Sequence, residues 1–302
     1  MTSRRPNRID LHTHTTRSDG VLSPLELFAE MRNYGMRVVA ITDHDSVEGV
    51  RELGAAEVGG DRFGMRLIPG IEMNAVAGDD LGHLWPGEVH ILGYGVDIDD
   101  ERLAAALRAQ RAARDARIDE TLDRLRQLDA GLADAVVSRL DRRDTSLGRP
   151  HLARALIAAG RAADVPDAFD RFLARGRPAY VRRRGLSVRG CLDAIRAAGG
   201  IPVLAHSSQA PEQPELIDLL VDWGLGGLEV YYGGYGGSGH GFRADARLRL
   251  ERFANERGLL ATGGSDYHGD AVSYADAQVS TFVPDAVGEA LLSALSLPAS
   301  LP

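Results

Sequence analysis

The sequence of 302 residues has few features that would tie a protein to a membrane or to an oxidising compartment. It contains a single cysteine, Cys191, which excludes an intramolecular disulfide framework and is typical of a reducing cytoplasm. No apolar run approaches the length of a membrane span, and no apolar segment follows the polar, basic N-terminus as it would in a signal peptide. We therefore expect a cytoplasmic protein with no membrane partner.

An excess of positive charge is also missing. The chain has 35 Lys and Arg residues against 43 Asp and Glu residues, which gives a net charge of −8. Surfaces that bind duplex nucleic acid are usually basic, so we do not expect general duplex binding. A small anionic substrate stays open, because bound metal ions can outweigh the global charge locally. No pattern in the sequence indicates the oligomeric state.

Strand and helix patterns alternate along residues 1–98 and again along residues 180–302. The first helix is well delimited, with Ser23 as N-cap, Pro24 in the first position and Gly35 at the end. The predicted strands are 8–14, 38–42, 67–75, 89–96, 201–205, 227–232 and 259–262, and the predicted helices are 24–34, 47–58, 188–198, 215–223, 242–257 and 287–295. This alternation favours an α/β fold with a parallel sheet or barrel, of about seven strands where the standard barrel has eight.

Residues 99–179 differ from the rest of the chain in composition and in the spacing of their apolar residues. They are rich in Ala, Arg and Leu at helical spacing and contain no strand candidate. We interpret them as a helical insertion subdomain between the two parts of a barrel, 1–98 and 180–302. The glycine-rich stretch 233–239 is typical of a mobile loop.

Metal-ligating residue types gather at the predicted strand ends. Those at or just after the carboxyl end of a strand are His12, His14, His44, Glu72, His206, Asp266 and His268, whereas His90 lies at the start of its strand. In a parallel barrel these ends meet at one face, where barrel active sites lie. Six of the nine histidines are therefore expected near one another.

Two of these signals are ambiguous when taken alone. His12 and His14 point to the same side of a strand, which suits a divalent metal, but two structural histidines would give the same pattern. Glu72 follows an apolar run, and a carboxylate buried there needs a partner such as a metal ion. Their common location favours a metal cluster over independent structural explanations.

Seven short segments, in the same order along the chain, carry a resemblance to a known family. They are Asp10–His14, Ser18–Gly20, Ile41–Asp45, Gly70–Glu72, His90–Tyr94, Pro202–His206 and Gly264–His268. With them the chain resembles the PHP (polymerase and histidinol phosphatase) family of metal-dependent phosphoesterases, which implies a distorted (β/α)7 barrel. Gly148–His151 and Arg177–Val181 are similar to the subgroup that acts on 3′,5′-nucleoside bisphosphates or short oligonucleotide ends.

The resemblance also implies three divalent metal ions. It implies that His12, His14, Glu72 and Asp266 hold the first ion, Glu72, His90 and His206 the second, and Asp19, His44 and His268 the third. This assignment leaves His83 as a loop residue. Manganese is favoured, with iron and zinc as alternatives, since mixed histidine and carboxylate sites accept all three.

For the reaction, the expected nucleophile is a water that bridges the first two ions. His206 or a metal-bound water would protonate the leaving oxygen, and Asp266 and Asp43 would complete the catalytic set. The expected substrate contacts are Arg149, Arg177, His151 and Tyr232. Arg149 could instead be a surface residue at a helix start and Arg177 a partner in a salt bridge, and Tyr231, Tyr232 and Tyr235 could either stack a base or form a lid.

Other functions remain open from sequence. The same fold and metals would serve a phosphatase acting on histidinol phosphate or a sugar phosphate, or an amidohydrolase-like enzyme that attacks a carbonyl. A non-enzymatic binding module would be expected to have lost ligands, whereas all nine are in place. Departures from the family pattern fall in Ser207–Gln209, in Tyr231–Tyr235 and at Arg177, positions expected to line the substrate pocket.

Overall fold

The structure is a computed structural model that describes residues 7–54, 61–62, 64–77, 81, 88–140, 146–234 and 241–298. The chain divides into two compact units, residues 1–106 together with 186–302, and residues 107–185. The boundaries at 99 and 179 expected from the sequence stay a prediction. Within the described ranges, no helix is both long and apolar enough to cross a membrane.

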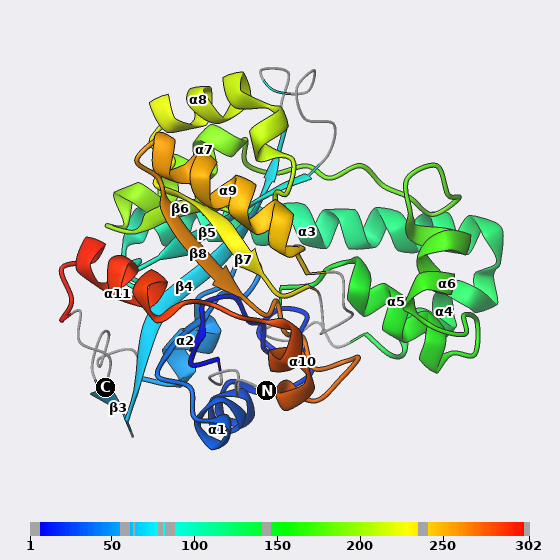
Figure 1. Ribbon diagram of the computed structural model, residues 1–302. Coiled ribbons are helices and arrows are strands. Elements are labelled where there is room, and N and C mark those ends of the chain that lie inside the picture. The colour runs from blue at the N-terminus through cyan, green and yellow to red at the C-terminus, as the bar shows by residue number, and fades with distance from the viewer. Residues whose placement is uncertain are drawn as a thin grey trace. The chain divides into compact units, whose positions relative to one another are not determined.

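The first unit contains a mixed sheet that curls into a nearly closed barrel (Figure 1). Its strands are β1 (Ile9–Asp10), β2 (Val38–Ile41), β3 (Asp61–Arg62), β4 (Met65–Val76), β5 (Glu88–Tyr94), β6 (Ile201–Leu204), β7 (Gly227–Tyr232) and β8 (Leu260–Gly264). Seven of them follow the order β1-β2-β4-β5-β6-β7-β8, and β3 pairs with β4 outside this path. The first and last strands meet where the amide of Leu11 donates to the carbonyl of Gly263 at 3.1 Å. The predicted seven-stranded α/β barrel is thus confirmed.

The expectation of an all-parallel sheet is wrong at one place. β5 runs antiparallel to both β4 and β6, whereas β1, β2, β4 and β6 to β8 pair in parallel along the rest of the order. A parallel connection needs a crossover of a dozen residues or more, and residues 77–87 are too few to supply it. The reversal places the beginning of β5 beside the end of β4, with Asn74 opposite His90.

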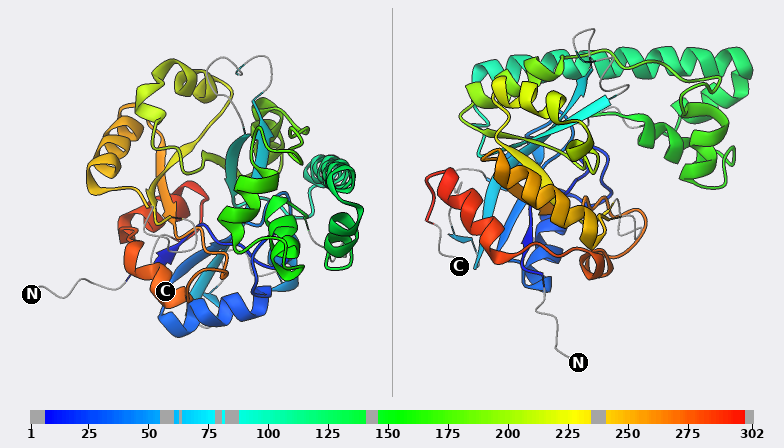
Figure 2. Two further views of the ribbon diagram at one scale, coloured as in Figure 1. Left: turned by 90° about the vertical axis from the view of Figure 1, so that its right-hand side faces the viewer. Right: turned by 45° about the horizontal axis from the view of Figure 1, so that its top comes forward.

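Helices cover the outside of this sheet. They are α1 (Pro24–Tyr34), α2 (Glu48–Glu52), α7 (Val188–Ala197), α8 (Pro214–Asp222), α9 (Ala244–Glu256), α10 (Tyr274–Ser280) and α11 (Asp285–Ala294), with a 3-10 turn η3 (Ala210–Glu212). α7 packs against β4, β5 and β6, α9 against β7 and β8, and α11 against β8. Figure 2 shows α1 in blue, α9 in orange and α11 in red on the periphery of the strands. Because the strands have helices on one face and barrel interior on the other, residues such as Val38, Val39 and Ile41 are fully buried.

Local sequence signals explain where the first helix begins and ends. The Ser23 hydroxyl accepts the amide of Glu26, and the Glu26 carboxylate accepts the amide of Ser23, which forms a capping box. Gly35 ends the helix with φ of 92°, a conformation that glycine adopts without strain. α2 is shorter than the predicted helix 47–58, of which residues 55–58 lie outside the described part.

A buried aspartate explains why α10, which the sequence did not predict, packs where it does. The Asp10 carboxylate, fully buried at the end of β1, accepts hydrogen bonds from the Tyr274 hydroxyl at 2.9 Å and the Gln278 amide at 2.7 Å. It also accepts hydrogen bonds from the amide and the hydroxyl of Ser265, at 2.9 and 2.6 Å. Burial raises the pKa of Asp10, although these hydrogen bonds act in the opposite direction. Asp10 therefore fastens α10 and the segment after β8 to β1.

The second unit is helical over its described residues. It contains most of α3 (Glu101–Leu128), which begins in the first unit, followed by α4 (Ala130–Val137), α5 (Arg149–Ala158), α6 (Val165–Ala168) and a π-helix η2 (Phe169–Leu173). Its own apolar core joins Leu122 and Leu125 of α3 to Leu152 and Leu156 of α5.

The close approach of β8 to β1 generates a prediction about Gly264. A Cβ added at Gly264 would lie 2.4 Å from the amide nitrogen and 2.6 Å from the Cβ of His12. We expect Gly264→Ala to lower the free energy of unfolding, measured by urea denaturation, by about 1–3 kcal/mol through overpacking. In the control Gly190→Ala the new Cβ meets nothing closer than 3.4 Å, so we expect unchanged or slightly higher stability. Equal stability of both variants would contradict the close packing of Gly264 against His12.

Candidate metal centre

A single buried carboxylate lies at the centre of the histidine cluster. Glu72, on β4, is 1% exposed. Its Oε2 lies 3.4 Å from His12 Nε2, 3.3 Å from His14 Nε2 and 2.8 Å from His44 Nδ1, and its Oε1 lies 2.8 Å from His90 Nδ1 and 3.2 Å from His206 Nε2. Burial by itself would raise the pKa of Glu72, but the surrounding imidazoles, His44 and His90 first, hold it well below its usual range.

Three side chains converge just beyond the ends of β1 and β8. The Oδ1 atom of Asp266 lies 3.3 Å from His12 Nε2 and 3.2 Å from His14 Nε2, and these three side chains offer ligand atoms within 4.8 Å of one another. Glu72 Oε2 contacts the same two histidine nitrogens. A metal ion bonded at about 2.1 Å to tetrahedral donors separates neighbouring donors by about 3.4 Å. The spacing of Asp266 from the two histidines therefore suits one divalent ion.

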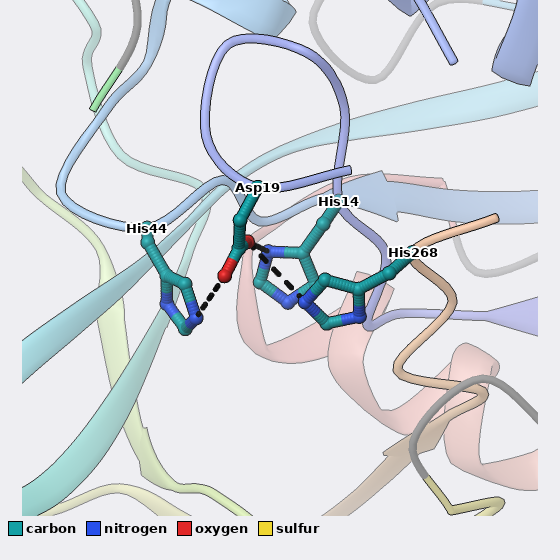
Figure 3. Close-up of side chains that lie close together, drawn as sticks. All are labelled: His14, Asp19, His44 and His268. Atoms are coloured by element: carbon teal, nitrogen blue, oxygen red, sulfur yellow. Dashed lines mark ion pairs between the residues drawn. The ribbon is translucent and has the colours of Figure 1, made fainter. Parts of the chain in front are cut away.

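A second group surrounds Asp19, whose carboxylate lies between three imidazoles (Figure 3). Asp19 is 3.7 Å from His44 Nε2, 3.8 Å from His14 Nδ1 and 3.3 Å from His268 Nε2. Figure 3 shows His44 on one side of the carboxylate and His14 with His268 on the other. The four side chains offer ligand atoms within 4.8 Å of one another.

A third group lies at the edge of the cluster where β5 begins. His44, Glu72 and His90 present ligand atoms within 4.8 Å of one another, and His206 Nε2 lies 3.2 Å from His90 Nδ1. His44 and His14 thus each touch more than one group. All nine residues proposed as ligands from sequence lie in this connected cluster, while their division among separate ions stays a prediction.

Buried atoms without hydrogen bonds test whether the cluster fits a metal. His12 Nε2, His14 Nε2, His44 Nδ1 and Glu72 Oε2 have no hydrogen-bond partner among the residues that the structure describes. Buried polar atoms are otherwise hydrogen-bonded in folded proteins. All four point into the cluster, so a cation there would supply their missing partner, and the residues present fit a metal site.

Proton binding at His14 supports the same conclusion. Burial lowers the pKa of His14, but its contacts with Asp266 and Glu72 outweigh burial and raise the pKa to about 10. The carboxylates around His14 therefore attract positive charge, and a metal ion that binds His14 competes with a proton.

Backbone strain is concentrated at the same place. Among the described non-glycine residues, only Asp45, His206, Asp266 and Ser296 have positive φ, and the first three, with φ of 50°, 31° and 52°, lie in or beside the cluster. Such conformations cost free energy and are typical of functional sites. Hydrogen bonds hold them, since the Asp266 amide donates to the carbonyl of His12 at 2.8 Å and Asp45 Oδ1 accepts the amide of Asn74 at 3.0 Å.

Asp43 lies beneath the cluster, in contact with the loop that carries Asp19. It accepts hydrogen bonds from the Thr15 amide, the Thr15 hydroxyl and the Ser18 hydroxyl, each at 2.7 Å. In this position Asp43 holds residues 15–18 in place and thereby positions Asp19. Its catalytic role expected from sequence stays a prediction.

Tyr232 is the expected substrate contact that lies beside the metal ligands. Its hydroxyl donates to Asp266 Oδ2 at 2.9 Å, and its ring centroid lies 5.6 Å from that of His206 and 5.2 Å from that of Phe242. Tyr232 thus links a ligand to a partly exposed aromatic group. Tyr235 and His83 lie outside the described residues.

The other three expected substrate contacts belong to the second unit. Arg149 begins α5, with its guanidinium carbon 5.5 Å from the centre of the Phe169 ring. His151 accepts the amide of Gly148 through Nδ1 at 3.1 Å, and Arg177 forms an ion pair with Asp170. These contacts lie within the second unit, and contact with a substrate stays a prediction.

Two polar residues of the site were missed by the sequence analysis. Glu229, on β7, contacts His12 Nδ1 at 2.9 Å and accepts the amide of His206 at 2.7 Å. The Asn74 side chain contacts His90 Nε2 at 2.6 Å. Glu229 is a lone carboxylate inside an apolar run, which is the same sequence signal that marks Glu72.

Comparison with known proteins decides the family. A family model described as the PHP domain matches residues 10–126. A 5′-3′ exoribonuclease from Haemophilus influenzae is 33% identical over 266 residues, which cover 86% of this chain and 90% of that protein. The chain belongs to the PHP family of metal-dependent phosphoesterases. This confirms the resemblance seen in the motifs, and the protein is a metal-dependent hydrolase.

Two further PHP relatives extend over nearly the whole chain. A 3′,5′-nucleoside bisphosphate phosphatase from Chromobacterium violaceum is 31% identical over 271 residues, covering 86% of this chain and 87% of that protein. The crystal structure of a candidate metal-dependent phosphoesterase from Bifidobacterium adolescentis, 30% identical, matches with a TM-score of 0.78 over 96% of this chain and 97% of that one. Both units of the PHP protein are therefore included in these likenesses.

The central position of Glu72 generates a prediction for thermal unfolding. A ligand at about 100 times its Kd stabilises a protein by about 2.7 kcal/mol per site. Added Mn²⁺ should therefore raise the Tm of the EDTA-treated wild-type protein by several degrees. Glu72→Gln should remove most of that rise, because the substitution takes away the negative charge that five imidazoles face. The control is Glu251→Gln on α9, where the carboxylate accepts a hydrogen bond from the Tyr231 hydroxyl, and this variant should keep the full rise in Tm. An equal rise in all three proteins would exclude Glu72 as a ligand.

Proposed function

We propose that this PHP protein hydrolyses phosphate monoesters of small nucleotides, such as 3′,5′-nucleoside bisphosphates, or cleaves at the ends of short oligonucleotides. The observation that carries the proposal is the complete cluster of nine histidine and carboxylate side chains around Glu72. The names of two relatives, a nucleoside bisphosphate phosphatase and an exoribonuclease, support the nucleotide substrate. A cytoplasmic location stays a prediction.

The proposed cofactor is a set of three divalent ions, with manganese favoured over iron and zinc. The first would bind His12, His14, Glu72 and Asp266, the second Glu72, His90 and His206, and the third Asp19, His44 and His268. Divalent ions in such a site lower the pKa of bound water and neutralise charge on a phosphoryl group. The three groups of side chains that offer ligand atoms within 4.8 Å of one another support this number of ions.

The chain itself would supply proton transfer on the open side of the cluster. The side chains of His90 and His206 are 22% and 30% exposed, whereas those of His12 and His14 are fully buried. Burial lowers the pKa of His206, but its contact with Glu72 outweighs burial and raises it. A partly exposed imidazole on this side of the cluster is suited to protonate a leaving oxygen. The Tyr232 hydroxyl donates a hydrogen bond to Asp266 and thereby holds this carboxylate in position.

For phosphate binding we propose Arg149 and Arg177, with His151 and Tyr232 as further substrate contacts. A guanidinium presents two parallel N–H groups to a phosphate, which provides both charge and orientation. Arg177 is held by Asp170 in this structure, so a phosphate would compete with that ion pair.

An activity panel tests the proposed function. We expect the Mn²⁺-loaded protein to release phosphate or nucleotide from 3′,5′-bisphosphates or 5′-phosphorylated oligoribonucleotides with a higher kcat/KM than from histidinol phosphate, sugar phosphates or carboxylic esters. EDTA should abolish turnover, and His14→Ala should lower kcat/KM at least 100-fold while the Glu251→Gln control keeps it. Preference for histidinol or sugar phosphates would change the substrate class, and turnover of carboxylic esters alone would exclude phosphoester hydrolysis. Full activity of His14→Ala would contradict the metal assignment.

A second experiment tests the arginines. Hydrogen bonds to charged groups contribute about 1.5–3 kcal/mol, so Arg149→Ala and Arg177→Ala should each lower kcat/KM by roughly 10-fold or more. Arg126→Ala is the matched control in the same unit, since Arg126 is exposed and, among the described residues, pairs locally with Asp123 on α3. Unchanged kinetics in Arg149→Ala or Arg177→Ala would assign that arginine a structural role alone, as the ion pair of Arg177 with Asp170 already allows.

A further inference from the structure

Glu229 is a fully buried acid within the barrel that belongs to none of the expected ligand sets. It lies on β7 with 1% of its surface exposed. Its Oε1 is 2.9 Å from His12 Nδ1, and its Oε2 accepts the backbone amide of His206 at 2.7 Å. Each oxygen therefore contacts a different histidine.

The contact with His12 determines which ring nitrogen faces the cluster. A carboxylate can only accept a hydrogen bond, so Nδ1 of His12 must carry the proton and donate it. In the neutral ring Nε2 then has the lone pair that a metal ion can bind, and this atom points at Glu72 and Asp266 with no hydrogen-bond partner in the described part of the chain. A carboxylate behind a histidine in this way fixes the orientation and raises the basicity of a metal ligand.

The contact with His206 acts on the backbone instead of the ring. His206 has φ of 31°, in the left-handed region that residues other than glycine avoid. The bond from its amide to Glu229 helps to hold this conformation. In it the ring lies with Nε2 3.2 Å from both Glu72 Oε1 and His90 Nδ1.

We propose that Glu229 is a positioning residue that sets two ligands of different ions at once, His12 through its ring and His206 through its backbone. The inference rests on the metal centre of the proposed function. It deepens that function by making the first two ions depend on one side chain outside the ligand set. The contacts of the third group join Asp19 to His14, His44 and His268.

The direct test is Glu229→Gln, which keeps the shape of the side chain but has one acceptor where the carboxylate has two. A glutamine can satisfy either the Nδ1–H of His12 or the amide of His206, and its NH₂ group then faces the other donor. Loss of such a supporting group weakens metal binding by about 10- to 100-fold. After dialysis against Mn²⁺ near the wild-type Kd, the variant should lose the ions of the first two groups and keep the third, as measured by metal analysis. The visible spectrum of the Co²⁺-loaded protein should change with it.

The matched control is Glu251→Gln, a Glu-to-Gln change at the hydrogen-bond partner of Tyr231, which should keep wild-type stoichiometry and spectrum. Wild-type affinity, stoichiometry and spectrum in Glu229→Gln would overturn the inference while leaving the proposed function intact. A wild-type protein that binds no Mn²⁺ would instead overturn the proposed function. If Glu229→Gln fails to fold, Glu229→Asp takes its place, because it keeps the charge but is too short to reach both partners. The same loss of two ions is expected, and full stoichiometry would again refute the positioning role.

Discussion

The structure depends on one constraint, the negative charge of Glu72 inside the barrel. A carboxylate that is almost fully buried is unfavourable unless positive charge compensates it. Here five imidazoles face its two oxygens, and two further carboxylates, Asp19 and Asp266, share those imidazoles. Protons on the histidines can compensate part of this negative charge, but several ligand atoms of the cluster still lack hydrogen bonds among the described residues. Divalent cations satisfy both the charge and the lone pairs.

The surrounding fold is arranged to hold these charges together. Hydrogen bonds from Asp10 join the segment after β8 to β1, and those of Asp43 hold the loop that carries Asp19. Glu229 contacts the His12 ring and the His206 backbone. None of these three acids is an expected ligand, yet all are buried. The strained backbone at His206 and Asp266 persists because such hydrogen bonds fix it. The interior of the barrel thus consists of a cluster of ligands and a second layer of acids that support them.

The sequence could predict the parts of this arrangement that local pattern specifies. Ser23 and Gly35 mark the ends of α1, and the histidines after apolar runs mark strand ends that share a face. The reversal of β5 could not be derived from strand patterns, because strand direction depends on pairing across the sheet. This explains why His90, at the wrong end of a supposedly parallel strand, still reaches Glu72. The role of α10 comes from its contact with Asp10, far away in the chain, and could not be derived from local pattern. Glu229 has a local signal, as a carboxylate inside an apolar run, but its partner His12 is likewise distant in the chain.

The central claim is that Glu72 is at the centre of a metal cluster. Anomalous X-ray scattering from crystals of the Mn²⁺-loaded wild-type protein tests it most directly, because the signal locates manganese without reference to activity. We predict anomalous peaks within bonding distance of Glu72, one shared with His12, His14 and Asp266 and another with His90 and His206, and a further peak beside Asp19. Crystals soaked at saturating Mn²⁺ that show no peak bonded to Glu72 would contradict the account.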